Sequence, residues 1–65
     1  MLNAKEKALE LYNKFWDVYQ HDPVAQECAL ICVNELIEVY DAIGYDEEDS
    51  EIVYLEEVKI QIYLL

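Results

Sequence analysis

The chain has 65 residues, with 15 acidic side chains against four lysines, a formal net charge of −11 and a hydrophobic content of 55%. This charge argues against direct binding of nucleic acid, which needs clustered Lys or Arg, and against binding of anionic membranes. A chain of this length forms at most one domain and buries too little surface to enclose a deep substrate cleft.

The first expected helix covers residues 4–19. Asn3 and Glu6 have the spacing of a capping box, in which each side chain accepts a hydrogen bond from the other residue's backbone amide. Apolar residues then recur at helical spacing, with charged and polar residues on the opposite arc. The pattern predicts that one apolar stripe faces the core: Ala4, Ala8, Leu11, Phe15 and Tyr19.

The second expected helix covers residues 23–43. Asp22 is a good N-cap, Pro23 suits the first helical position, and Gly44 is a typical C-terminal stop. The apolar residues cover most of the circumference, which is typical of a central helix, and Leu30, Val33 and Ile37 widen one side. Small residues near its start predict close helix packing at Ala25, Cys28, Ala29 and Cys32. The main stripe continues through Leu36, Val39, Tyr40 and Ile43.

The third expected helix covers residues 50–64, after an acidic break at 45–50. One apolar stripe runs through Ile52, Leu55, Val58, Ile62 and Leu65. Residues 58–62 also alternate as a strand would, so a C-terminal strand stays open as an alternative. We prefer the helix because the pattern runs on without a break from residue 54 and no second strand is available for pairing. The sequence therefore predicts an all-α, three-helix mini-domain, with a long central helix hairpin and a C-terminal helix.

The two cysteines and the single histidine were considered as metal ligands. Cys28 and Cys32 lie on one helical face, and His21 could add a third ligand, but the spacing differs from that of structural zinc sites. We therefore expect the cysteines to be free thiols that fill space at a helix contact, and His21 to be solvated. No cofactor, metal or catalytic residue is predicted. The absence of a signal-peptide pattern and of a long apolar run favours a cytoplasmic protein.

The most acidic stretch follows Gly44. A calcium loop needs alternating ligands and a central Gly, and the spacing here does not match it. We expect a solvated acidic surface, while an acidic mimic of DNA that occupies a basic partner remains an alternative. The residues of this surface are Asp46, Glu47, Glu48, Asp49 and Glu51.

More apolar surface is present than three helices can bury against one another. The third helix has a second stripe, formed by Val53, Ile60 and Leu64, on the side away from its first. Exposed patches of this kind mark interfaces, and a second copy in a symmetric dimer is the commonest solution. We therefore expect the mini-domain to be completed by homo-oligomerisation. The predicted interface residues are Trp16, Val53, Ile60, Tyr63 and Leu64.

Three blocks of the sequence, residues 7–15, 25–37 and 54–62, resemble a family of very small proteins encoded by phages and prophages of gut Bacteroidota. The most specific part is Cys28-Ala29-Leu30-Ile31 with Glu35, and the resemblance covers most of the chain. Family members often read Glu-Val-Lys-x-Glu-Ile near the end, whereas this chain has Gln61 and a more apolar tail. The resemblance implies a viral accessory protein that acts inside a bacterial cell, and it carries over no residue roles.

We expect a non-enzymatic accessory protein that binds a host or phage protein. One alternative is an anti-defence sponge that holds a small signalling molecule at a subunit interface. The scarcity of cations counts against it, because only Lys5, Lys7, Lys14 and Lys59 are available for an anionic ligand. The second alternative is the acidic DNA mimic. The charge is uneven, since residues 1–14 carry +1 and the remainder carries −12.

Overall fold

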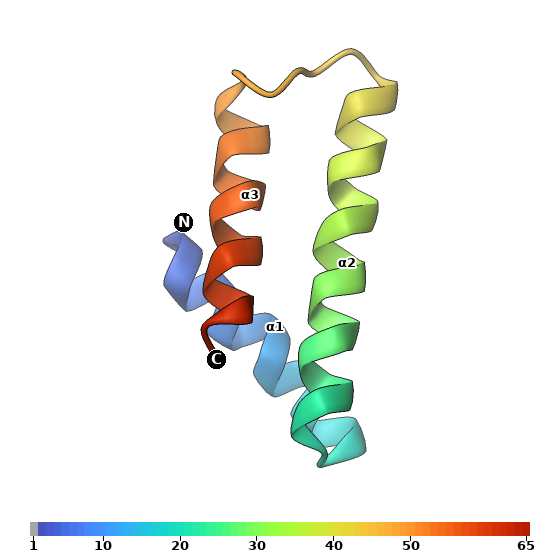
Figure 1. Ribbon diagram of the computed structural model, residues 1–65, viewed down its shortest axis with the longest axis vertical. Coiled ribbons are helices and arrows are strands. Elements are labelled where there is room, and N and C mark those ends of the chain that lie inside the picture. The colour runs from blue at the N-terminus through green and yellow to red at the C-terminus, as the bar shows by residue number, and fades with distance from the viewer. Residues whose placement is uncertain (1) are drawn as a thin grey trace.

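The computed structural model describes residues 2–65, which form three α-helices: α1 (Ala4–Tyr19), α2 (Asp22–Ala42) and α3 (Ser50–Tyr63). The predicted all-α, three-helix class is confirmed. Helix α3 continues through residues 58–62, so the strand alternative is wrong, and no strand occurs within residues 2–65. Figure 1 shows α2 and α3 side by side along the long axis, with α1 crossing behind their lower halves.

The start of α1 has the expected capping box. The Glu6 amide donates to Asn3 Oδ1 over 2.8 Å, and the Asn3 amide donates to Glu6 Oε1 over 3.1 Å. The helix ends at Gln20, whose φ of 51° is left-handed and whose amide donates to the Trp16 carbonyl over 2.7 Å. This left-handed residue stops α1 and lets the chain turn into α2 within a short link.

The expectation that Asp22 caps α2 is wrong. The N-cap is His21, which makes no side-chain capping bond, and Asp22 is the first helical residue. The Asp22 carboxylate instead accepts a hydrogen bond from the Tyr12 hydroxyl of α1. A carboxylate in the first turn also lies at the favourable end of the helix dipole, so Asp22 stabilises the start of α2 without capping it.

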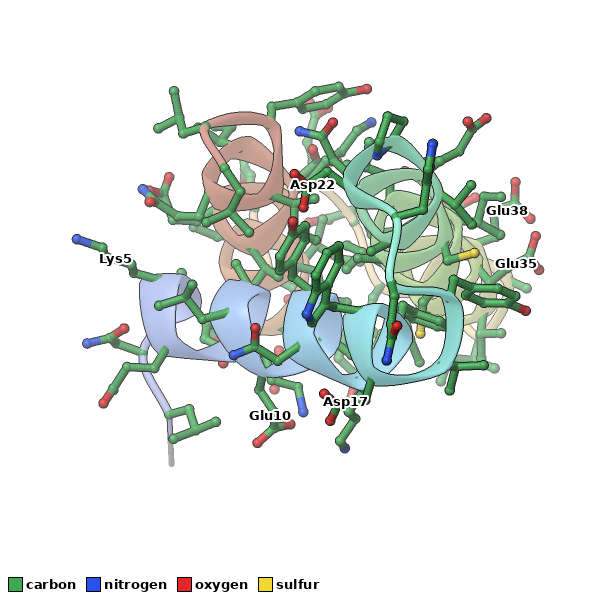
Figure 2. All side chains as sticks on the ribbon, turned by 90° about the horizontal axis from the view of Figure 1, so that it is seen from below. Lys5, Glu10, Asp17, Asp22, Glu35 and Glu38 are labelled. Carbon is green, nitrogen blue, oxygen red and sulfur yellow. The ribbon has the colours of Figure 1, made fainter. Side chains whose placement is uncertain are left out.

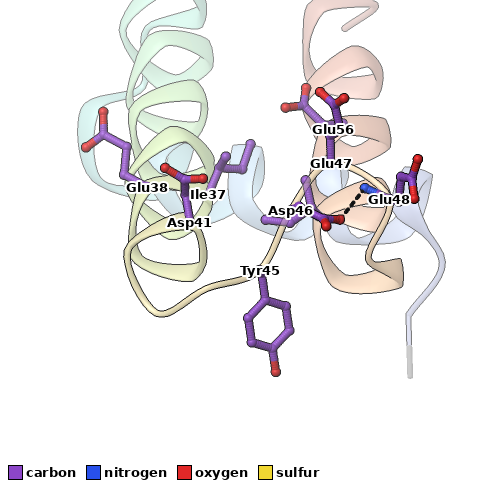
Figure 3. Close-up of a pocket in the computed structure, with 9 residues that line it drawn as sticks. Ile37, Glu38, Asp41, Tyr45, Asp46, Glu47, Glu48 and Glu56 are labelled. Atoms are coloured by element: carbon purple, nitrogen blue, oxygen red, sulfur yellow. Dashed lines mark hydrogen bonds between the residues drawn. The ribbon is translucent and has the colours of Figure 1, made fainter.

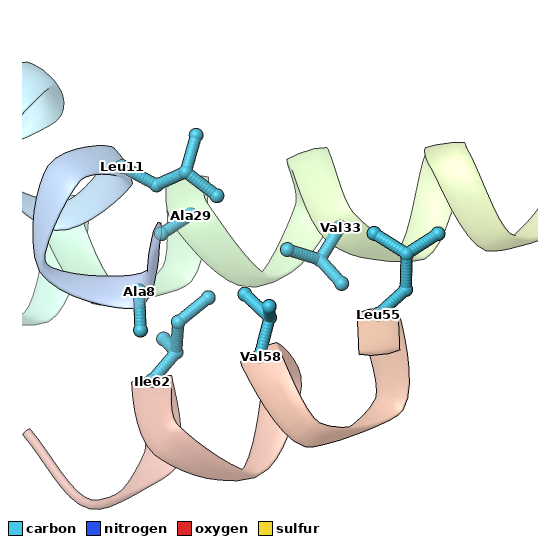
Figure 4. Packing of buried hydrophobic residues seen from close by; sticks show 7 residues of the cluster. All are labelled: Ala8, Leu11, Ala29, Val33, Leu55, Val58 and Ile62. Carbon is cyan, nitrogen blue, oxygen red and sulfur yellow. The ribbon is translucent and has the colours of Figure 1, made fainter. Parts of the chain in front are cut away.

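The core lies where all three helices meet, around the crossing of α1 (Figure 4). Ala8 and Leu11 of α1 lie against Ala29 of α2 and Ile62 of α3, and the small alanines let the helices approach closely. The seven buried side chains of the cluster come from all three helices: Ala8, Leu11, Ala29, Val33, Leu55, Val58 and Ile62.

Several residues of the predicted inward stripes are exposed in the structure. Tyr19 and Leu65 lie at the ends of α1 and of the chain, beyond the core. Leu36 and Val39 lie on the second half of α2 and Ile43 is its C-cap, in a part of the hairpin that α1 does not cover (Figure 1). Helix α1 has 16 residues against 21 in α2, and it crosses obliquely. The periodicity identified the stripe, but one short crossing helix buries only its first half.

Within residues 2–65, no helix combines the length and the apolar content that crossing a membrane requires.

Candidate functional site

The five side chains predicted as an interface are all exposed, but they lie on different surfaces. Val53, Ile60 and Leu64 share one face of α3, because their spacings of seven and four residues return to the same side of a helix. This set is called the outer stripe. It points away from the buried residues of α3, and Leu64 is 73% exposed. The outer stripe is therefore an exposed apolar row of α3.

Tyr63 and Trp16 lie apart from the outer stripe. Tyr63 lines a shallow groove between the end of α3 and the start of α2, together with Pro23, Leu30 and Ile31. Trp16 belongs to α1 and is 38% exposed. The structure thus divides the predicted interface over separate faces of the molecule.

The residues predicted for close helix packing lie on the first half of α2. Ala25 and Ala29 are completely buried, and Cys32 packs against the core cluster. Cys28 and Cys32 are half-buried free thiols. Figure 4 places Ala29 beside Leu11 of α1, as expected for a small residue at a helix crossing.

A groove of ≈ 400 Å³ opens between the second half of α2 and the first half of α3. This groove, here called the tyrosine groove, is mostly apolar. The Tyr54 hydroxyl donates to the Leu2 carbonyl over 2.8 Å, which joins this part of α3 to the residues before α1. The groove is lined by Leu36, Tyr40, Ser50, Glu51, Tyr54 and Leu55.

A second hollow, of ≈ 520 Å³, lies on another side of the same two helices. Leu36 and Ile37 line different hollows because neighbouring residues on a helix point about 100° apart. Six carboxylates face this hollow, so we call it the acidic hollow (Figure 3). They come from α2, from the loop and from α3: Glu38, Asp41, Asp46, Glu47, Glu48 and Glu56.

The predicted acidic surface lies in and after the loop between α2 and α3. Asp46, Glu47, Glu48 and Glu51 are exposed, and Asp49 is half-buried. Two of these carboxylates order the loop: Asp49 Oδ2 accepts from the Asp46 amide over 2.8 Å, and Asp46 Oδ1 accepts from the Glu48 amide over 2.9 Å (Figure 3). They therefore act as local turn acceptors, a common use of aspartate.

Two lysines of α1 share one carboxylate partner. Lys7 Nζ donates to Glu10 Oε1 over 2.6 Å, and Lys14 Nζ lies 3.7 Å from the same oxygen. The hydrogen bond between Lys7 and Glu10 lowers the pKa of Glu10 and raises the pKa of Lys7. The nearby Tyr54 and Cys32 side chains also raise the pKa of Lys7. Lys7 therefore lies close to the groove and to the cysteine side of α2. Figure 2 shows the charged side chains of Lys5, Glu10, Asp17, Glu35 and Glu38 projecting outward.

The remaining candidate residues from the sequence are His21 and the metal-ligating side chains. His21 is exposed at the start of α2. Among the described residues, no three His, Cys, Asp or Glu side chains are grouped as metal ligands. What the residues do form is an outer stripe, a tyrosine groove and an acidic hollow.

Sequence reasoning missed two of these features. It treated the acidic loop alone and did not join it to Glu38, Asp41 and Glu56. The spacing of three residues between Glu38 and Asp41, on one side of α2, was a usable signal for this. The tyrosine groove had no such signal, because it exists only where α1 fails to cover Tyr40 and Tyr54.

Comparison of the chain with protein-family models, with curated protein sequences and with solved structures finds no match.

Proposed function

We propose that this chain is a non-enzymatic binding protein that works through protein–protein contact as a small acidic homo-oligomer. The observation that carries the proposal is the amount of ordered apolar surface left on rigid helices. Val53, Ile60 and Leu64 on α3, and Val39 and Ile43 on α2, are each more than half exposed. Contiguous apolar rows of this kind on a small protein are typical of interaction sites. A role as an accessory protein of a phage remains part of the proposal, on the resemblance alone.

The outer stripe has the form expected of a helix that packs against another helix. Its three apolar residues return to one side of α3, with Glu57 between Val53 and Ile60 in the same row, and Gln61 Nε2 donates to the Glu57 carboxylate over 3.1 Å. Apolar anchors surrounded by polar groups are the usual anatomy of a protein interface. The outer stripe is therefore the surface that we assign to a host or phage protein.

Site-specific photocrosslinking in the cells that naturally carry this sequence tests the proposal. A photoreactive amino acid at Ile60 is expected to give an adduct with a second protein that carries no copy of this chain. The same group at Asn13, an exposed polar position of α1, is the matched control and is expected to give no such adduct. Equal labelling from both positions, or no adduct from Ile60, would contradict the proposal.

The acidic hollow favours a second candidate, a mimic of DNA that blocks a basic protein. Six carboxylates on one concave surface give a dense negative charge, which attracts basic partners at long range. Glu38, Asp41 and Glu56 are held by helices, so their spacing is fixed. The test is competition between this chain and DNA for a purified basic protein. Competition that weakens steeply as salt is raised supports mimicry. The triple variant Glu38→Gln, Asp41→Asn, Glu56→Gln is the control and is expected to lose the competition.

The sponge for a small anionic molecule has no comparable support. The chain has only four lysines and no arginine, so few cations are available to hold an anionic ligand. Native mass spectrometry of the purified protein tests this alternative, since a retained small molecule adds its own mass to the oligomer.

A further inference from the structure

The apolar stripe of α2 is a continuous seam that α1 fills only halfway. Its members alternate in spacings of four and three residues, the pattern of positions that pack into a facing helix. Exposure of the side chains rises along the seam with distance from α1. Ala25 and Ala29 are 0% exposed, and Cys32 is half-buried. Leu36, Val39 and Ile43 follow with 41%, 55% and 66% exposure. We call these last three residues the open seam: Leu36, Val39 and Ile43.

We propose that the open seam binds the open seam of a second copy of this chain, with the two α2 helices antiparallel. This inference rests on the proposed homo-oligomer and gives it an interface and a direction. It assigns self-association to α2, and it leaves the outer stripe of α3 to the other protein.

The open seam is self-complementary about its own middle. A two-fold axis near Val39 places Leu36 of one copy against Ile43 of the other, and brings the two Val39 side chains together at the centre. Isologous contacts of this kind are what a symmetric dimer requires. The row adjoins the tyrosine groove through Leu36, so Tyr40 and Tyr54 extend the apolar surface on one side.

Two acidic residues lie beside the open seam, one on each flank. Glu35 is on the same flank as Ala42, which follows it by seven residues, and Glu51 lines the tyrosine groove on the other flank with Tyr40. In the antiparallel arrangement, Glu35 of one copy faces the region of Gly44 in the other, so the two carboxylates stay apart. The two Glu35 carboxylates of the dimer therefore do not meet at the axis.

Charge complementarity selects the antiparallel direction. The acidic loop at 46–49 follows the open seam, whereas the first half of the seam lies under α1, where Lys7 and Lys14 are. Antiparallel helices bring the acidic loop of one copy over the lysine-bearing side of α1 in the other copy, twice by symmetry. A parallel arrangement would instead place the two acidic loops side by side, and their negative charges would repel each other.

A matched pair of substitutions tests the interface. Val39 and Val53 are the same residue type with nearly equal exposure, 55% and 53%, but only Val39 lies on the open seam. We expect Val39→Lys to raise the dimer dissociation constant on the order of a hundredfold, because two unpaired charges would be buried at the axis. Val53→Lys is expected to leave it unchanged. Sedimentation equilibrium gives the constants, and far-ultraviolet circular dichroism verifies that both variants keep their helices.

The possible outcomes separate this inference from the proposed function. If Val53→Lys dissociates the oligomer and Val39→Lys does not, the open seam is not the interface, while the proposed homo-oligomer stands. If neither variant dissociates it, the inference is also overturned. If the unsubstituted chain is a monomer at tens of micromolar, both the inference and the homo-oligomer fail.

A charge-reversal cycle tests the direction of the helices. Lys14→Glu is expected to weaken dimerisation about tenfold, since each dimer contains two such sites. Adding Glu47→Lys and Glu48→Lys is expected to restore most of the affinity, because the reversed charges again face opposite ones. If the effects of the Lys14 substitution and of the Glu47 and Glu48 substitutions on the dimer dissociation constant simply add, the two sites are not coupled, which would exclude the antiparallel arrangement.

Discussion

The Tyr12 hydroxyl donates a hydrogen bond to the carboxylate of Asp22, so the middle of α1 is tied to the first residue of α2. The bond spans the tight turn between the two helices, beside the first half of α2 that α1 covers. The open seam lies on the second half of α2, beyond α1.

The Tyr12–Asp22 bond is expected to make stability depend on pH in the alkaline range. The hydrogen bond to the Asp22 carboxylate raises the pKa of Tyr12 above its ordinary value. Because the folded pKa is the higher one, this stabilisation is fully present below the unfolded value of about 10 and is lost as pH rises through the folded pKa. Urea unfolding at a series of pH values measures it. Tyr12→Phe is expected to remove this part of the decrease in unfolding free energy at alkaline pH. An unchanged dependence of the unfolding free energy on pH would contradict the role of the bond.

The capping box at the start of α1 is expected to contribute measurably to stability. Asn3→Ala removes the acceptor of the Glu6 amide and should lower the free energy of unfolding by about 0.5–2 kcal/mol. Asn13→Ala is the matched control, because Asn13 is exposed in the middle of the same helix. Its effect should be close to zero or slightly stabilising. Denaturant unfolding measures both, and equal losses would argue against the cap.

The two faces of α3 are expected to respond differently to the same truncation. Ile62 is completely buried, and Ile62→Ala should cost about 2–5 kcal/mol of unfolding free energy. Ile60 is two residues earlier on the outer stripe, and Ile60→Ala should cost well under this amount in the isolated protein. Thermal and urea unfolding compare them. A cost for Ile60→Ala equal to that of Ile62→Ala would show that self-association or the fold buries the outer stripe.

Gln26 is expected to hold the end of α3 against the start of α2. Its Nε2 donates to the Ile62 carbonyl over 3.0 Å, and this carbonyl in the last turn of α3 also accepts from the Leu65 amide over 3.1 Å. Gln26→Glu replaces the donor by a carboxylate next to that carbonyl and should cost about 1–2 kcal/mol. Asn13→Asp, at an exposed position of α1, is the control because it adds the same negative charge. Amide hydrogen exchange at the end of α3 should accelerate only in the first variant.

The helices could be predicted because their signals are local. The capping box of Asn3 and Glu6, the position of Pro23 and the apolar period of α3 all act within a few residues along the chain. The error at Asp22 has a tertiary cause, since its carboxylate bonds to Tyr12 of another helix instead of capping its own.

The candidate surfaces could be predicted only in part, because they depend on how far each helix reaches. The period of α3 placed Ile60 on the outside without any knowledge of packing. The apolar stripe of α2 could also be identified from the sequence. Its pattern does not show that α1 covers Ala29 and leaves Val39 exposed. The acidic hollow likewise needs Glu56 to face the loop, and this follows only from the pairing of α2 with α3.

Sedimentation equilibrium of the unsubstituted protein at tens of micromolar tests the central claim most directly. We expect a mass of twice the 7.7 kDa chain, falling toward a single chain on dilution, with helical content retained. A mass of one chain throughout that range would contradict self-association, because the open seam of α2 would then be stable in water without a second copy.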